Sequence, residues 1–185
     1  MEYWIWFSLL PYIGPTTANR LLEHFGDPSK IFQATISELI KIKGLSQRQI
    51  QSIACNKTLE HAYKVLDDCD KNSIKVLIKS DIRYPEQAGN LKDAPVVLYY
   101  KGHFQDMNEP VAIVGARRCT QEAKFCAVEL AEKYSMNGQT IISGMAKGID
   151  SYAHTACLKV GGYTVAIVGN GLDICYPSEH KKLME

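Results

Sequence analysis

Three short apolar segments in the second half of the chain constrain the fold most, because each of them runs directly into glycine. They read V-A-I-V-G at 111–115, T-I-I-S-G at 140–144 and T-V-A-I-V-G at 164–169. Apolar residues at helical spacing fill the intervals at 121–136 and 149–159. Short, continuously apolar strands joined by helical crossovers are typical of a parallel sheet. The sequence therefore predicts an α/β fold whose parallel sheet is covered by helices on both faces.

The first 70 residues lack this alternation and show apolar residues at helical spacing, interrupted by glycine and proline. The apolar opening at 3–10 has no positively charged start and breaks at Pro11, too early to span a bilayer, so it predicts a first core helix. Ser46 is a typical N-cap for a helix that runs through Ile53. We expect an all-helical domain over 1–70.

Two further strands are predicted after the helical region, I-K-V-L-I at 74–78 and P-V-V-L-Y-Y-K-G at 95–102. They precede the alternating pattern directly, so we assign them to the same α/β domain. This places the domain over 73–185.

Two segments of the helical region share a layout, one at 11–22 and the other at 42–53. Each contains an apolar residue, a glycine, a Ser or Thr cap and a new helix. The layout resembles the helix-hairpin-helix unit, whose turn offers backbone N–H groups to a DNA phosphate. Pro15 removes one useful N–H, and the second turn lacks the usual second glycine. Ordinary turns of a helical bundle therefore remain the alternative, with Arg20 and Arg48 as solvated surface charges.

The overall charge excludes any strong attraction of the whole molecule to a polyanion. The chain has 21 basic and 20 acidic residues, a formal net charge of +1. Anion binding must therefore come from a local arrangement. The six cysteines form no C-x-x-C pair and have no histidine at zinc-ligand spacing. We expect reduced thiols in a cytoplasmic protein, with no metal and no cofactor.

The three glycine-ended strands predict a phosphate-binding edge. Ligands collect outside the carboxyl ends of the strands in an open parallel sheet. Glycine there exposes main-chain N–H groups, and the helices that follow favour anions at their N-termini. The chain has neither a P-loop nor a G-x-G-x-x-G motif. The predicted DNA- or phosphate-binding residues are Gly115, Arg117, Arg118, Ser143, Gly144, Lys147, Gly148, Gly169 and Gly171.

Four polar residues are predicted to shape this edge. Asp150 lies in the first turn of the helix near Lys147, where capping of N–H groups is favoured over ligand contact. His154 lies four residues further, on the same helical face. No nucleophile is evident, so a structural Asp–His pair is favoured over a general base. Asp173 could bond a ribose or a loop amide, and Tyr176 could anchor a loop or stack on a base.

These motifs resemble the DNA-processing protein A family, also called DprA or Smf. The similar stretches are V-G-A-R at 114–117, S-G-M-A-K-G-I-D-S-Y-A-H at 143–154 and V-G-N-G-L-D-I-C-Y-P at 168–177, with R-Y-P-E-Q at 83–87 and A-P-V-V-L-Y-Y-K-G at 94–102. The helical region resembles that family's SAM-like or helix-hairpin-helix domain. The resemblance covers nearly the whole chain.

The resemblance implies a Rossmann-like domain that is not an enzyme. The family binds single-stranded DNA in a basic pocket and helps to load the RecA recombinase during natural transformation. It implies single-stranded DNA and RecA as partners, a possible homodimer, no membrane and a cytoplasmic location. By motif, the pocket would be lined by Gly115, Arg117, Ser143, Gly144, Lys147 and Gly148. It would be shaped by Asp150, His154, Gly169, Gly171 and Asp173.

The chain departs from the family pattern in three places. Ala116 stands where the family often has serine, so one hydroxyl contact to phosphate is missing. The helix after Thr120 lacks a frequent tyrosine–glycine pair. The family's domain continues through more strands than are present before Glu185, so the resemblance implies a C-terminally truncated form. Self-association and recombinase contact belong largely to that later part.

Two other classes of function remain open. Asp150 and His154 would suit a nucleotide-acting phosphoribohydrolase of a related Rossmann-like group, although the P-G-G-x-G-T-x-x-E stretch of that group is absent. Alternatively, the chain is a pure interaction module, whose glycines serve packing alone.

Overall fold

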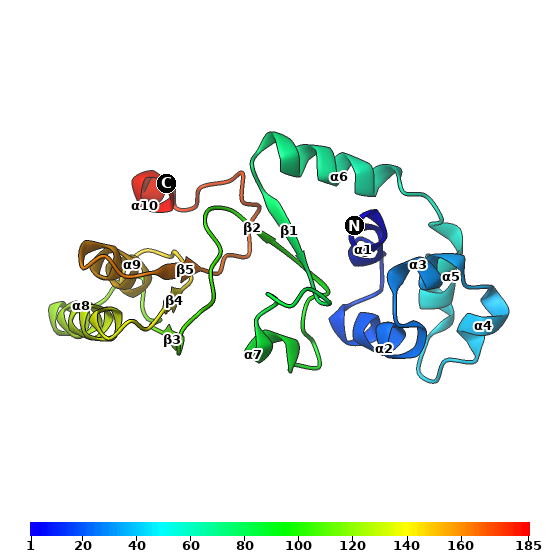
Figure 1. Cartoon of the computed structure of the whole chain (residues 1–185), viewed down its shortest axis with the longest axis horizontal. Helices are drawn as coiled ribbons and strands as arrows, with labels where there is room; N and C mark the ends of the chain where they lie inside the picture. The colour runs from blue at the N-terminus through cyan, green and yellow to red at the C-terminus, as the bar shows by residue number, and fades with distance from the viewer. The chain divides into compact units, whose positions relative to one another are not determined.

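The computed structural model describes residues 1–185, and the chain divides into two compact units, Met1–Gly102 and His103–Glu185. Figure 1 follows the chain from the N-terminal helices in blue to the C-terminal segment in red. None of the helices combines the length and the apolar composition that a membrane crossing requires. Each unit has its own hydrophobic core.

The first unit consists of seven helices and two strands. In chain order these are α1 (Glu2–Ser8), α2 (Pro15–Phe25), α3 (Pro28–Gln33), α4 (Ile36–Ile40), α5 (Gln47–Cys55), α6 (Glu60–Lys71), β1 (Lys75–Ile78), α7 (Glu86–Gly89) and β2 (Val97–Tyr100). The opening segment is confirmed as a core helix, since Ile5 and Phe7 of α1 are fully buried together with Leu21 and Ile53. Burial of these side chains supplies the main stabilisation of the unit.

Side chains fix several helix ends in this unit. The predicted cap Ser46 is confirmed, and it forms a capping box with Gln49 at the start of α5. Asp27 caps the N-terminus of α3 by accepting from the N–H of Ser29. At the other end of α3, Lys57 Nζ donates to the carbonyls of Ile31, Phe32 and Ala34. Burial lowers the pKa of Lys57.

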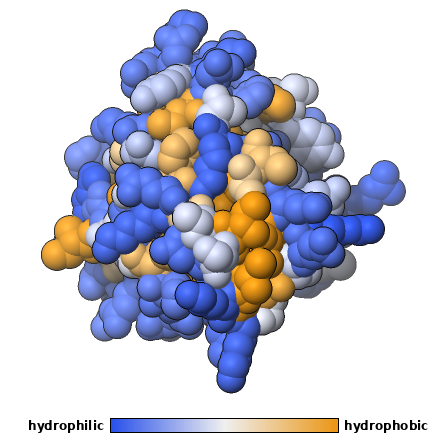
Figure 2. Space-filling view, turned by 90° about the vertical axis from the view of Figure 1, so that its right-hand side faces the viewer, coloured by the Kyte–Doolittle hydropathy of each residue, from blue (hydrophilic) through white to orange (hydrophobic).

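One face of the helical unit carries a central group of hydrophobic side chains bordered by hydrophilic ones (Figure 2). On α4, Ile36 and Ile40 are 56% and 65% exposed, whereas Leu39 is fully buried. This short helix therefore contributes Leu39 to the core and turns its other apolar residues to solvent.

The strands β1 and β2 pair with each other in antiparallel fashion, from Lys75 opposite Tyr100 to Ile78 opposite Val97. The sequence predicts both strands within the α/β domain, and the structure places them in a two-stranded sheet of their own, apart from the parallel sheet. Val96 and Val97 are buried in the core of the helical unit, and Val76 packs against the same core. The compact unit consequently extends to Gly102, beyond the boundary expected near residues 70–73.

The second unit contains the predicted parallel sheet. Its elements are β3 (Val111–Ala112), α8 (Gln121–Met136), β4 (Ile141–Ser143), α9 (Ile149–Lys159), β5 (Thr164–Ala166), a 3-10 turn (Ser178–His180) and α10 (Lys181–Met184). The strand order is β3-β4-β5 and both pairings are parallel. The helices α8 and α9 have the predicted bounds. The strands are shorter than predicted, but the α/β architecture is confirmed.

Helices cover this sheet less completely than expected. The core gathers Ala131 of α8, Ile141 of β4 and Ala153 of α9. These three elements lie together in Figure 1. Val114 and Ile167, which follow β3 and β5, are 70% and 66% exposed. After β5 the chain forms loops, the 3-10 turn and the short helix α10.

Candidate nucleic-acid interface

The turns that follow β3 and β4 lie against each other, and glycine makes this contact possible. Gly148 has a φ of +83°, and a Cβ atom there would lie 2.3 Å from the carbonyl oxygen of Ala116. The N–H of Ile149 donates to the same carbonyl at 3.3 Å. A Cβ atom on Gly115 would lie 2.7 Å from Ile149 Cγ1. The two predicted strand ends are therefore adjacent, and they are locked by backbone packing.

The chain after β5 joins the same edge. The N–H of Ile167 donates to the carbonyl of Ser143 at 2.8 Å. A Cβ atom on Gly144 would lie 3.8 Å from the carbonyl oxygen of Ile167. All three strand ends thus meet, as the sequence predicted, and we call residues 115–118, 143–148 and 167–171 the rim.

Ser143, a predicted contact residue, and Asp150, predicted to shape the edge, both form hydrogen bonds within the rim. The hydroxyl of Ser143 is buried and donates to the carbonyl of Ile113 at 2.6 Å. The carboxylate of Asp150 accepts from the N–H groups of Gly144 at 3.2 Å and Ala146 at 3.3 Å. Asp150 thus satisfies amides of the turn that precedes α9, whereas α9 itself has no side-chain cap hydrogen bond. These two main-chain donors, which the glycine pattern predicted to bind phosphate, therefore bind the carboxylate of Asp150.

The basic side chains of the rim are more accessible to a ligand than its main-chain amides. Arg117 and Arg118 are exposed, and neither makes a hydrogen bond or an ion pair. Lys147 Nζ donates to Glu179 Oε2 at 2.7 Å, with both side chains more than half exposed. The hydrogen bond from Lys147 lowers the pKa of Glu179. Exposed pairs of this kind contribute little to stability, so a phosphate can displace the carboxylate.

The remaining predicted residues lie on the loop after β5. A Cβ atom added to Gly169 would have no atom within 4 Å, so packing does not require glycine at this position. A Cβ atom on Gly171 would clash with Asp173 Oδ1, so the position of the Asp173 side chain requires glycine at 171. Tyr176 is 62% exposed and precedes Pro177 through a cis peptide bond. Both exposed side chains, Asp173 and Tyr176, are available to a ligand.

His154 has a structural role that differs from the predicted one. Its ring is fully buried, and Nδ1 lies 2.7 Å from Thr164 Oγ1, whose hydroxyl donates to the carbonyl of Ile141. Thr164 must therefore accept from Nδ1–H, which leaves Nε2 as a buried acceptor without a partner. Burial lowers the pKa of His154, against an opposing effect of Asp150. The predicted Asp–His hydrogen bond is absent, and His154 ties α9 to β5 as a neutral ring.

Two partners were missed by the sequence analysis. Glu179 lies 32 residues from Lys147 in the chain, and Thr164 lies 10 residues from His154. No local spacing rule links such pairs, so only the folded chain reveals them.

The fold and the rim define an α/β protein with a cationic, glycine-built edge on its parallel sheet. Residues 75–185 match the family model for DNA recombination-mediator protein A. Residues 8–54 match the model for a SAM-like Helix-hairpin-helix tandem. The chain belongs to the DNA recombination-mediator protein A family, and the hairpin interpretation of its helical region is confirmed.

Known relatives resemble this chain over most of its length. It is 30% identical to Protein Smf of Synechocystis sp. over 99% of the chain and 47% of the relative. It is 38% identical to DNA processing protein DprA of Streptococcus pneumoniae over 67% of the chain and 39% of the relative. The X-ray structure of DNA processing protein A from Streptococcus pneumoniae superposes with a TM-score of 0.73 at 26% identity, covering 100% of this chain and 63% of that one. The chain thus spans about half the length of the curated relatives it matches.

Proposed function

We propose that this protein binds single-stranded DNA along the rim. The observation that carries the proposal is the pair of exposed, unpartnered guanidinium groups, Arg117 and Arg118, on a turn that Gly148 locks against the end of β4. A guanidinium offers a fixed fork of donors to phosphate oxygens. A rigid turn holds that fork in place at little entropic cost.

In this proposal the predicted contact residues have unequal roles. Arg117 and Arg118 hold phosphates directly, and Lys147 joins them when it leaves Glu179. The main-chain amides of Gly144 and Ala146 take no part, because Asp150 accepts from both. Tyr176 supplies an exposed ring for a base. The phosphates are therefore held by side-chain charge, and binding weakens steeply as salt rises.

The wider role proposed is mediation of homologous recombination in the cytoplasm, by loading RecA onto the bound strand. It is supported by the family description and by the relatives named as DNA processing proteins. The role is one of binding, without catalysis. An enzyme acting on nucleotides receives no support from the rim, where His154 is buried against Thr164 and faces no nucleophile.

The test is the variant Arg117→Ala, titrated with a fluorescent oligo-dT at several salt concentrations. Loss of one charged contact is expected to weaken binding roughly tenfold and to lower the salt slope by about one. Lys159→Ala is the matched control, because Lys159 is an exposed cation at the far end of α9, with side chain 77% exposed. Equal affinity and equal salt slope for Arg117→Ala and the unaltered protein would contradict the proposal.

A further inference from the structure

Tyr12 stands out in the helical unit as an exposed aromatic residue held in an unusual backbone conformation. Its φ is 65°, in the left-handed region, and its side chain is 69% exposed. Bulky residues seldom adopt this conformation, because their Cβ atom crowds the backbone. No packing of the Tyr12 ring in the core offsets the cost, which directs attention to what the ring presents to solvent.

Side chains of α5 hold the backbone on both sides of this residue. The hydroxyl of Ser52 donates to the carbonyl of Pro11 at 2.6 Å, and Ser52 is itself buried. Gln49 Nε2 donates to the carbonyl of Tyr12 at 3.1 Å and to Thr17 Oγ1 at 3.1 Å. Gln49 is fixed in turn, because its Oε1 accepts from the N–H of Ser46. Tyr12, in the first hairpin segment, is thus a rigid platform whose backbone is held by side chains of the second segment.

The platform borders an open hollow with a free cation. The hollow has a volume of about 480 Å³ and is lined by Pro11, Tyr12, Arg48, Gln51, Ser52, Cys55 and Asn56. Arg48 is exposed and makes no hydrogen bond or ion pair. No carboxylate lines the hollow. An aromatic face, a guanidinium and amide groups are together the chemistry that receives a base and its phosphate.

The charge of the surrounding segments is also complementary to a polyanion. Segments 11–22 and 42–53 contain Arg20, Lys43 and Arg48 and no Asp or Glu, although the whole chain is nearly neutral. Arg20 differs from the solvated charge of the alternative interpretation, since its Nη1 donates to the carbonyl of Gly44 at 3.2 Å. Lys43 and Arg48 remain exposed. The hairpin face is therefore locally basic.

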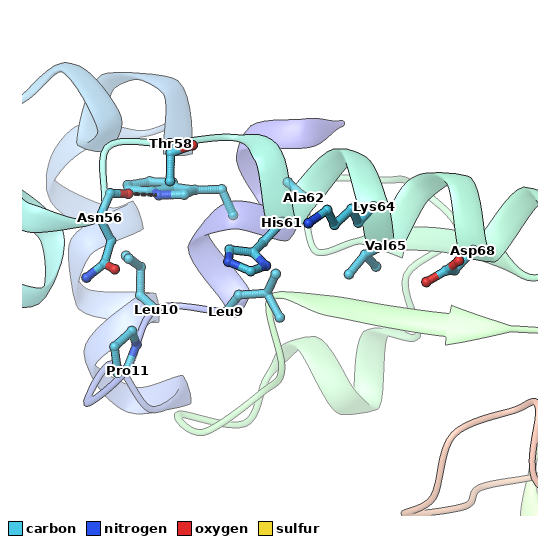
Figure 3. A pocket seen from close by; sticks show the side chains of 11 residues that line it. Leu9, Leu10, Pro11, Asn56, Thr58, His61, Ala62, Lys64, Val65 and Asp68 are labelled. Atoms are coloured by element: carbon cyan, nitrogen blue, oxygen red, sulfur yellow. Dashed lines mark hydrogen bonds between the residues drawn. The ribbon is translucent and has the colours of Figure 1, made fainter.

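The neighbouring cavity is less suitable for a nucleotide. It has a volume of about 370 Å³ and meets the hollow at Pro11 and Asn56. Figure 3 shows Pro11 and Asn56 at one end of it and Asp68 at the other, with Leu9, Leu10 and Val65 among its lining. His61 and Lys64 also line the cavity, but its lining is largely apolar and includes the carboxylate of Asp68, which suits a phosphate chain less well than the hollow beside Tyr12. The strand is accordingly expected to stay on the side of Tyr12 and Arg48.

We propose that Tyr12 stacks on a base of bound single-stranded DNA while Arg48 holds an adjacent phosphate, giving the helical unit its own contact with the strand. The inference rests on the proposed DNA-binding function and adds a second site to it. Stacking tolerates any base, because every base has a π-face. The site would therefore add affinity without sequence preference.

The experiment titrates the whole chain with a fluorescent oligo-dT and with the same oligonucleotide carrying abasic positions. Tyr12→Ala is expected to weaken binding to oligo-dT about tenfold, the effect of losing one stacked base. Tyr12→Phe, which keeps the ring, should bind like the unaltered protein. Tyr63→Ala is the control, because Tyr63 is 55% exposed on α6. The loss caused by Tyr12→Ala should shrink on the abasic strand. Photo-crosslinking with an iodouracil oligonucleotide should mark Tyr12.

The outcomes separate this inference from the proposed function. Full affinity of Tyr12→Ala together with weakened binding of Arg117→Ala would overturn the stacking site and leave the rim intact. Weakened binding of Tyr12→Ala with an unaffected Arg117→Ala would support the stacking site and overturn the rim. Equal losses for Tyr12→Ala and Tyr12→Phe would exclude stacking, since the ring is retained in one of them.

Discussion

The rim of the parallel sheet and the hairpin turns of the helical unit look alike in sequence, because both place glycine before a new helix. In the rim, the N–H groups of Gly144 and Ala146 donate to Asp150. In the second hairpin, Ser46 and Gln49 satisfy each other's N–H groups through a capping box. Neither region therefore leaves the amides of these residues free for an anion. The difference lies in how each turn is fixed, by close backbone approach in the rim and by side-chain clamps in the hairpins.

The comparison teaches that a bare glycine turn is not in itself an anion site. Both regions instead carry guanidinium groups without partners, Arg117 and Arg118 on the rim and Arg48 on the hairpin face. Glycine and the clamps position the turns, while arginine supplies the charge.

The largest effect is expected where the rim depends on backbone contact. In Gly148→Ala, the new methyl group would meet the carbonyl oxygen of Ala116 at a position where φ is +83°. We expect the free energy of unfolding to fall by roughly 3 kcal/mol, measured by urea denaturation. Gly161→Ala is the matched control, with a φ of +76° and no atom within 4 Å of the added Cβ. It should cost only about 1 kcal/mol. Equal losses in the two variants would mean that the contact with Ala116 does not fix the rim.

A smaller effect is expected from breaking the clamp in the hairpins. Gln49→Ala removes the capping-box partner of Ser46 and the hydrogen bonds to Tyr12 and Thr17. The expected destabilisation is about 1–2 kcal/mol, followed by the fluorescence of the buried tryptophans of α1 on denaturation. Gln47→Ala, at an exposed position of the same helix without a side-chain hydrogen bond, should change stability by less than about 0.5 kcal/mol. A similar loss in Gln47→Ala would show that helix propensity, and not the clamp, was measured.

The smallest effect concerns the charge balance of the rim. Glu179→Gln releases Lys147 from its exposed partner. Stability should change by less than about 0.5 kcal/mol, because surface pairs contribute little. Affinity for oligo-dT at low salt should rise about twofold to fivefold, because the substitution removes a negative charge that would repel the DNA phosphates near Lys147. Glu132→Gln is the control, because Glu132 pairs only loosely with Lys159, at 3.8 Å. Weaker DNA binding by Glu179→Gln would contradict the proposal that DNA phosphates lie beside Lys147.

The sequence by itself determined the features that depend on neighbouring residues. Helical spacing between glycine-ended strands placed α8 and α9 at their observed bounds, and Ser46 identified the start of α5. Parallel pairing of β3, β4 and β5 followed from the crossovers. These signals are local, because hydrogen bonds within a helix and at its cap join residues only three or four positions apart.

The tertiary structure alone decided which partners distant residues would find. It paired β1 with β2, since their valines complete the core of the helical unit. It also formed three hydrogen-bonded contacts: His154 with Thr164, Ser143 with the carbonyl of Ile113, and Asp150 with the N–H of Gly144. The physical reason is that burial forces each polar group to be satisfied by whatever lies beside it in space, and that neighbour is fixed only once the chain has packed.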